Sequence, residues 1–296
     1  MSTRVAELFT INTASADTAA WPRIVKRQHC AYLGRKCLKI RKSRPTVSIG
    51  TCSVCYGRAN TPVVICPHRL LERNQIFTDC LHLLTSHKPG NEFHVVSEVA
   101  VPGGSVDYFL LSARHGKVTD FVGIELQTVD TTGTVWPERQ RFLASAGITA
   151  AERDAASTKS FGMNWKMTAK TTLVQLHHKV ETFESLNKHL VIVLQDELLD
   201  YMKRMFSFDH ISDAKPDDAM HFHSYALKRA DSQMRLELSH RLSTDSRGIA
   251  ASLGLQAESS VELAEIVSQL EAKISKSTLL NVFPNRSEEI ADITSA

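Results

Sequence analysis

The 296-residue sequence contains no long apolar run, and this absence excludes a large class of proteins. No stretch approaches the roughly 20 consecutive apolar residues that a transmembrane helix needs. The first ten residues, MSTRVAELFT, also lack the charged-then-apolar pattern of a secretory signal peptide. We therefore expect a cytoplasmic protein without a membrane partner, long enough to bury a core in one or two domains.

A large net charge is also missing, since the formal value of +3 neither requires nor excludes a polyanionic partner. The charge is unevenly distributed, however: residues 23–44 hold nine lysines and arginines and no acid. Such a stretch predicts a surface that contacts phosphates, and a solvated basic loop is the alternative. The candidate DNA-binding residues are Arg35, Lys36, Lys39, Arg41, Lys42 and Arg44.

Cysteine is nearly confined to one region, because five of the six lie between residues 30 and 66. In a cytoplasmic protein, such clustering indicates a metal site before disulfides. Residues 21–67 are too poor in apolar residues to fold without an additional stabilising link. Four thiolates would provide one by binding zinc or a single iron. The candidates for the four places are Cys30, Cys37, Cys52, Cys55 and Cys66, whereas Cys80, within an apolar helical stripe, is expected to be buried packing.

Spacing alone leaves the choice of four ligands open. Cys52 and Cys55 form a C-x2-C pair that could make a metal knuckle. Cys30 and Cys37 are separated by six residues, which is a workable loop, and Cys66 would tie the module to the helix that follows it.

The order of the predicted elements indicates an α/β fold. Residues 1–20 lack periodicity and are interpreted as a loose arm. We expect helices over 67–87, 172–186, 196–206, 217–245 and 257–278, and strands over 91–101, 189–195 and the arms of a hairpin that turns at His115–Gly116. This order predicts a mixed sheet with helices on its faces. The expected parts are an arm with the metal module (1–67), a core (68–206) and a C-terminal helical region (207–296).

Four histidines fall in the predicted helices, at His177, His178, His221 and His223. Each pair could be interpreted as metal ligands. We expect them instead to be surface or partly buried helical residues.

The predicted hairpin brings two acids and an amide together. If it turns at Gly116, Asp107 lies opposite Glu125, since both are equally distant from that residue. Directly opposed residues bring their Cβ atoms to roughly 5 Å. Gln127 shares the face of Glu125, because alternate residues of a strand point the same way. Glu98, on the preceding strand, could reach the same edge.

Two carboxylates at this distance repel each other unless a cation lies between them. Carboxylate oxygens and an amide carbonyl suit Mg²⁺, which keeps several waters and leaves room for a phosphate. Such a metal would generate hydroxide and stabilise the departing oxygen of a phosphodiester. Acids on a solvated sheet face are the structural alternative.

The hairpin residues resemble the PD-(D/E)xK nuclease core. The resemblance is carried by Asp-x17-Glu-Leu-Gln, from Asp107 through Glu125 to Gln127, within that order of helices and strands. The sequence departs from the motif twice, with Val106 in place of the usual proline and Gln127 in place of the usual lysine. Because glutamine is neither an acid nor a base, activation of water would fall to the metal.

Residues 22–140 resemble the NotI-type restriction endonucleases. The matching text is C-x6-C, then KIRKSRPTVSIGTCSV, VICPHRLLERNQIFTDC, GGSVDYF and GIELQTVDTTGT. The resemblance implies a rubredoxin-like module that binds one iron through four cysteines, with Cys55 supernumerary. The ligands that it favours are Cys30, Cys37, Cys52 and Cys66.

The same resemblance implies a catalytic site on a PD-(D/E)xK core. The implied catalytic residues are Asp107, Glu125 and Gln127, and the implied Mg²⁺ ligands are Glu98, Asp107 and Glu125. The predicted function is a type II-like restriction endonuclease that hydrolyses double-stranded DNA by Mg²⁺-dependent attack of water. Because a palindromic site is matched by a two-fold symmetric reader, we expect a homodimer.

Two other functions agree with the same residues. The first is a non-catalytic nucleic-acid-binding protein stabilised by a metal module, in which the hairpin acids lie on the surface. The second is a DNA nuclease of repair or mobile-element transfer. Mg²⁺-dependent cleavage of plasmid DNA distinguishes the first alternative, and discrete fragments distinguish the second.

Overall fold

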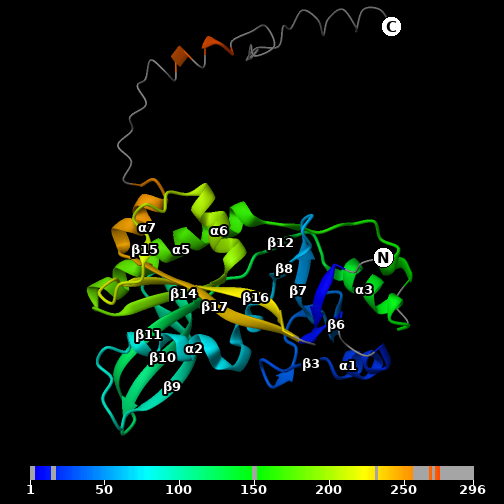
Figure 1. The fold of residues 1–296 in the computed structure, drawn as a ribbon, viewed down its shortest axis with the longest axis horizontal. Coiled ribbons are helices and arrows are strands. Elements are labelled where there is room, and N and C mark those ends of the chain that lie inside the picture. The colour runs from blue at the N-terminus through cyan, green and yellow to red at the C-terminus, as the bar shows by residue number, and fades with distance from the viewer. Residues whose placement is uncertain are drawn as a thin grey trace, which may run out of the picture. The chain divides into compact units, whose positions relative to one another are not determined.

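The computed structural model describes residues 4–14, 18–148, 152–230, 233–255, 267–268 and 271–273. The chain divides into two compact units, Met1–Leu255 and Gln256–Ala296. Every labelled helix and strand lies in the first unit (Figure 1). The helix predicted over 257–278 therefore falls mostly outside the described residues.

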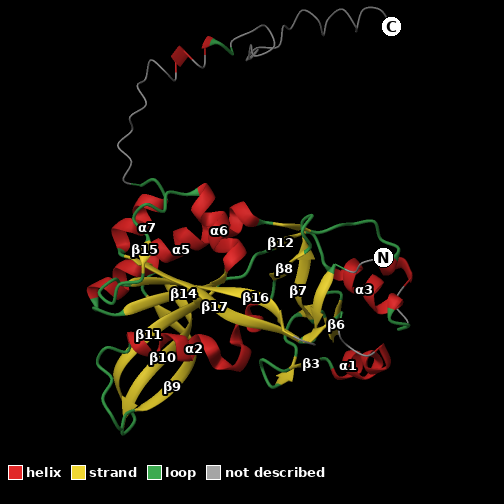
Figure 2. Cartoon of the chain, in the orientation of Figure 1, coloured by secondary structure: helices red, strands yellow, loops and turns green. Residues whose placement is uncertain are grey.

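A seven-stranded mixed sheet forms the centre of the first unit (Figure 2). Its order is β15 (Ser212–Asp213), β17 (Gln233–Thr244), β16 (Met220–Ala230), β14 (His189–Gln195), β11 (Lys117–Leu126), β10 (Gly104–Arg114) and β9 (Glu92–Val101). The β11–β14 and β14–β16 pairs are parallel and the other pairs are antiparallel. The predicted mixed α/β fold is thus confirmed.

Three helices cover one face of this sheet (Figure 1). They are α5 (Trp165–Ser185), α6 (Asp196–Met205) and α7 (Ser246–Ser252). Apolar residues recur along α5 every three or four positions, and Leu173, Leu176, Val180 and Phe183 are buried against the sheet. This spacing is that of one face of an α-helix, which is why the sequence predicted this element correctly.

The opposite face is covered by a broken helical segment instead of the single helix expected over 67–87. It consists of η2 (Pro67–Asn74), α2 (Gln75–Cys80) and η3 (Leu81–Leu83). The break lies at Glu72 and Arg73, whose backbones are not helical. Glu72 turns inward there, since its carboxylate accepts hydrogen bonds from Arg69, Arg235 and the backbone N–H of Leu236.

A smaller four-stranded sheet carries the N-terminal part of the chain. Its order is β2 (Ile11–Asn12), β1 (Val5–Leu8), β7 (Thr51–Tyr56) and β8 (Thr61–Val64). The loose arm expected over 1–20 is wrong for β1, which is buried along its whole length. Apolar Val5 and Leu8 pack there against Trp21 and Phe142, and buried Glu7 pairs with Arg69.

Short elements surround this sheet. They are η1 (Thr18–Ala20), α1 (Trp21–Arg27), β3 (His29–Cys30), β4 (Arg35–Lys36), β5 (Ile40–Arg41), β6 (Arg44–Ser48), β12 (Thr131–Thr132), α3 (Trp136–Ser145), α4 (Glu152–Ala155) and β13 (Gly162–Met163). The β3–β4 and β5–β6 pairs are two-stranded antiparallel hairpins. They hold the basic stretch that the sequence singled out.

The helix predicted over 217–245 is wrong, because residues 220–230 and 233–244 form β16 and β17. His221 and His223 are accordingly buried in a central strand instead of lying on a helix. No helix among the described residues is long and apolar enough to cross a membrane.

Candidate active site

The β10–β11 hairpin brings Asp107 opposite Glu125, and a bulge sets this register. Near the turn, Arg114 pairs with Lys117 and Ala113 with Val118, but farther out Tyr108 pairs with Ile124. The pairing shifts by one residue between Ser112 and Ala113. Without that shift, Glu125 would point to the other face of the sheet, since a slip of one residue exchanges the faces of a strand.

The two acids are partly buried and held by different partners. Asp107 Oδ2 accepts a 2.8 Å hydrogen bond from the backbone N–H of Leu126. Glu125 Oε1 accepts a 2.6 Å hydrogen bond from Lys179 Nζ. Burial raises the pKa of Glu125, Lys179 lowers it, and the charges of Asp107 and Glu98 raise it again. The net effect raises the pKa of Glu125, which lies within electrostatic range of both other acids.

Glu98 lies beside Asp107 on the edge strand β9. The pairs Val106–Val99 and Tyr108–Ser97 flank these two residues in the β9–β10 ladder. The backbone of Glu98 is left-handed, with φ of 58°, which is uncommon for a residue other than glycine. Its side chain is exposed, so this carboxylate is open to solvent at the rim of the site.

Gln127 follows the last residue of β11. Its backbone N–H donates to the carbonyl of Val193 on β14 at 2.9 Å, and its side-chain amide donates to the carbonyl of Thr128 at 2.8 Å. The amide N–H₂ is thus engaged with the main chain. The side-chain carbonyl remains the atom suited to a water or a metal ion.

Lys179 is a residue of this site that sequence reasoning missed. It comes from α5, and its ammonium contacts both Glu125 Oε1 and the carbonyl of Ser105 at 2.6 Å. Its side chain is only 7% exposed. In the sequence it is an ordinary lysine of an amphipathic helix, and only the packing of α5 on the hairpin reveals its position.

Two of the predicted DNA-binding residues act on the acidic site. Burial lowers the pKa of His68, the cations of Arg35 and Lys39 lower it further, and Asp107 raises it. Arg35 also lowers the pKa of Tyr108 against the raising effects of burial and of Asp107. Arg35 of the β3–β4 hairpin and Lys39 just after it therefore lie within electrostatic range of residues beside Asp107.

The other predicted DNA-binding residues divide into two groups. Lys36 Nζ donates to the carbonyl of Thr46, and Arg41 pairs with Asp154 at 2.8 Å while it stacks over Trp136. Lys42 and Arg44 are exposed on the β5–β6 hairpin. Arg41 is thus partly occupied by the protein itself, whereas the exposed cations are available to a partner.

Four of the cysteines act on one another. Burial raises the pKa of Cys30, Cys52 and Cys66, and the negative charges of neighbouring cysteines contribute to each rise. The negative charge of Cys37 raises the pKa of both Cys30 and Cys66. All four are buried and none forms a disulfide.

Cys55 lies apart from these four. It is three residues from Cys52 on β7, whose pairing with β1 is irregular there, and it borders a different hollow beside Pro62 and Arg229. Burial raises its pKa, and Arg229 and Arg4 lower it. The knuckle that the C-x2-C spacing suggested is therefore not formed. Among the described residues, no group of three or more His, Cys, Asp or Glu side chains has an arrangement that could hold a metal ion.

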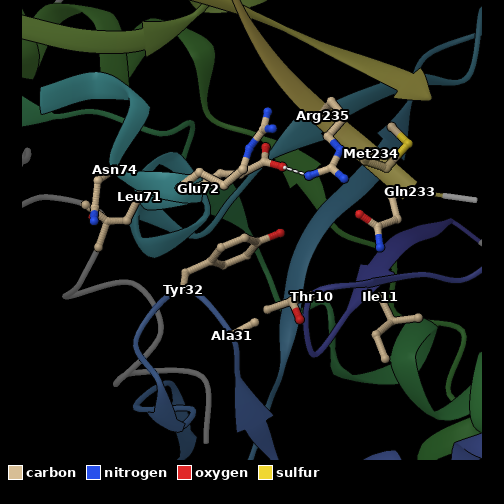
Figure 3. A pocket seen from close by; sticks show the side chains of 11 residues that line it. Thr10, Ile11, Ala31, Tyr32, Leu71, Glu72, Asn74, Gln233, Met234 and Arg235 are labelled. Atoms are coloured by element: carbon tan, nitrogen blue, oxygen red, sulfur yellow. Dashed lines mark hydrogen bonds and ion pairs between the residues drawn. The ribbon is translucent and has the colours of Figure 1, made fainter. Parts of the chain in front are cut away.

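A separate hollow of about 410 Å³ lies between the N-terminal sheet and the end of β17 (Figure 3). Tyr32, Glu72 and Arg235 line it, and Glu72 pairs with Arg235 at 3.0 Å. Behind it, Arg69 pairs with Glu7 and Glu72, both at 2.9 Å, and all three are buried. This ion network joins the small sheet, η2 and β17.

The fold and the hairpin define an α/β protein with an acidic site on a mixed sheet. The family model of the restriction endonuclease NotI matches residues 27–237. Since this match spans most of the sequence, the chain belongs to the NotI restriction endonuclease family, and the predicted resemblance is confirmed.

Other comparisons add little. No curated protein matches the sequence. Among solved structures, SfsA of Pyrococcus furiosus in complex with Ca²⁺ is 12% identical, with a TM-score of 0.30 over 66% of this chain and 71% of that chain. At that TM-score, the likeness adds nothing to the assignment.

Proposed function

We propose that this protein is a sequence-specific DNA endonuclease that hydrolyses phosphodiester bonds of double-stranded DNA with Mg²⁺. The observation that carries the proposal is the opposition of Asp107 and Glu125 on β10–β11 in a chain of the NotI family. Mg²⁺ is usually held by only one or two carboxylates together with waters and substrate phosphates. Two opposed acids therefore fit this ion even though no cluster of three acids exists among the described residues.

Asp107 and Glu125 would hold the ion, and Glu98, the third predicted ligand, would reach it only if its exposed side chain moved, because the three acids form no ready metal site. When bound, the ion supplies a Lewis acid and lowers the pKa of water. The hydrogen bond from Leu126 N–H fixes the Asp107 carboxylate, and the side-chain carbonyl of Gln127 orients water. The protein thereby orients the acids before the substrate arrives.

The basic residues next to this site would bind the DNA backbone. Arg35 and Lys39 act on the same imidazole as Asp107, and Lys42 and Arg44 are exposed. Lys36 and Arg41 complete the proposed set. Contacts of this kind position a duplex without reading its sequence. A homodimer would apply two such sites to a palindromic sequence.

We also propose that Cys30, Cys37, Cys52 and Cys66 hold one structural iron or zinc ion, although their thiols are not arranged around a common point in the described structure and would have to move to bind it. The support is their donor chemistry, since four buried free thiols act on one another and Cys55 does not act on them. The resemblance to the family favours iron. The module would lie within residues 1–67, and the core extends past its expected end at residue 206, because β16 and β17 complete the central sheet.

Digestion of a long sequenced DNA with Mg²⁺ tests the function. We expect discrete fragments, whose sequenced ends report the recognition site. Nonspecific degradation would favour a nuclease of repair or transfer. Binding of DNA without any nick would favour a non-catalytic binding protein. Sedimentation of the protein measures whether it is a homodimer.

A further inference from the structure

We infer that Lys179 supplies the cation that the second motif lacks at Gln127. This inference rests on the proposed endonuclease function and concerns the same site. The motif normally places a lysine two residues after its glutamate, on the same strand face. Here that position holds an amide, and the ammonium beside Glu125 comes from α5 instead, at 2.6 Å from Oε1.

The approach of α5 to the hairpin depends on two glycines. Gly103 and Gly104, at the turn between β9 and β10, have φ of 92° and 134°. A Cβ atom on Gly103 would lie 2.3 Å from the carbonyl oxygen of His178, and one on Gly104 would lie 3.3 Å from Lys179 Cε. Only a turn without these side chains lets α5 lie close enough for its lysine to reach the acid.

The hydrogen bonds of Lys179 leave one donor for a substrate. An ammonium group has three N–H donors. One donates to the carbonyl of Ser105 and one to Glu125, and no other described residue is recorded as an acceptor. The third N–H can therefore donate to a water or a phosphate oxygen that arrives between Glu125 and Asp107. Burial of a charged lysine is energetically unfavourable. Its placement beside acids therefore supports a role for Lys179 in the function of the site.

Lys179 acts as a positioning residue in this account. It holds the Glu125 carboxylate in place and directs one N–H at the reacting group. In hydrolysis the water oxygen bonds to phosphorus, and the leaving oxygen takes the electron pair of the broken bond. The water's two protons end on the leaving oxygen and the solvent. The lysine is unchanged at the end.

The test asks whether a lysine at the usual motif position, residue 127, restores the cleavage that is lost when Lys179 is replaced. Lys179→Gln removes the charge, and we expect the single-turnover rate of Mg²⁺-dependent cleavage to fall by about 10²–10³-fold, with DNA affinity unchanged. Adding Gln127→Lys to this variant restores a lysine beside Glu125, and we expect at least a tenfold recovery. Lys170→Met, on the exposed side of α5, is the matched control and should cleave like the wild type.

The outcomes separate this inference from the proposed function. If the wild type cleaves, Asp107→Asn does not, and Lys179→Gln cleaves at the wild-type rate, the lysine inference is wrong and the function stands. Failure of Gln127→Lys to restore any rate also overturns it. If the wild type does not cleave with Mg²⁺, both are wrong. Should Lys179→Gln not fold, Lys179→Met replaces it in the same comparison, because methionine keeps an unbranched stem in the buried site.

Discussion

Asp107 accepts a 2.8 Å hydrogen bond from the backbone N–H of Leu126, across the two strands of the acidic hairpin. Asp107 is thus fastened to the residue that directly follows Glu125. This bond orients one carboxylate relative to the other without a metal ion. An arrangement held in this way loses little freedom when an ion and a phosphate enter.

Removal of the Gln127 side chain should have a small effect on cleavage. Its amide can orient water but cannot transfer a proton. We therefore expect Gln127→Ala to lower the single-turnover rate by about tenfold, less than the 10²–10⁴-fold typical of an acid or base. A rate loss in that higher range would mean that the glutamine has a larger role than orientation.

The cysteines should differ in their effect on metal content. We expect the purified protein to contain about one iron or zinc ion per chain, because a structural site closes with four thiolate ligands. Cys52→Ser should lose this metal, whereas Cys55→Ser should retain it, since the charged neighbours of Cys55 are Arg229 and Arg4 and not the other cysteines. Elemental analysis measures both. A wild-type protein without metal, or loss of metal from Cys55→Ser, would contradict the proposed module.

The buried ion network should be important for stability. Arg69 is 0% exposed and pairs with Glu7 and Glu72. Arg69→Met leaves the buried carboxylate of Glu7 without its cation, while Glu72 keeps Arg235, and breaking a buried pair in this way typically costs about 3–5 kcal/mol. Denaturant unfolding measures the loss. The exposed Lys228–Glu237 pair is the control, and Lys228→Met should change the free energy of unfolding little. Equal effects of both variants would show that burial of the network does not matter.

Acid should destabilise the protein through two buried histidines. Burial, above all, lowers the pKa of His221 to about 4 and of His223 to about 3, from an ordinary value of 6.5. Below pH 6.5, the unfolded chain therefore binds protons at these two histidines that the folded chain does not bind. The contribution of these histidines to stability is full above pH 6.5 and is lost as the pH falls from 6.5 through about 4 to about 3.

The measurement is the free energy of unfolding against pH for the wild type and for His223→Gln. We expect the wild type to lose stability over this window and the variant to show a smaller slope. The charged or titratable neighbours that also lower the pKa of His223 are His82, His221 and Arg241, and they are unchanged in the variant. An identical slope in both proteins would remove His223 from the account.

The sequence predicted the hairpin pair because strand geometry is local. The turn at His115–Gly116 was recognised, and the estimate that placed Asp107 opposite Glu125 agrees with the observed register. The agreement depends on the bulge near Thr119, which shifts the pairing by one residue. No pattern in the sequence predicted this bulge. Lys179 could not be found in this way, since its contact with Glu125 spans 54 residues and arises from helix packing.

The strands β16 and β17 were mistaken for a helix for a physical reason. Their residues include many leucines, lysines, arginines and methionines, which favour helices when taken alone. Six residues at the start of β16 are buried without interruption, so no alternation marks that strand. In β17, however, Met234 and Leu236 are buried and alternate with less buried residues. This alternation with a period of two is the sequence signal of a strand. The helical propensity of the same residues outweighed it in the prediction.

The most direct test of the metal-dependent site is cleavage of plasmid DNA by the wild type and by Asp107→Asn. Asparagine keeps the shape and can still accept the hydrogen bond from Leu126, but it removes the charge that holds Mg²⁺. We predict Mg²⁺-dependent discrete fragments from the wild type and a rate at least about 1000-fold lower for the folded variant, as expected for the loss of several kcal/mol of metal stabilisation. Equal cleavage by the two proteins, or none by the wild type with Mg²⁺ on any DNA, would contradict the account.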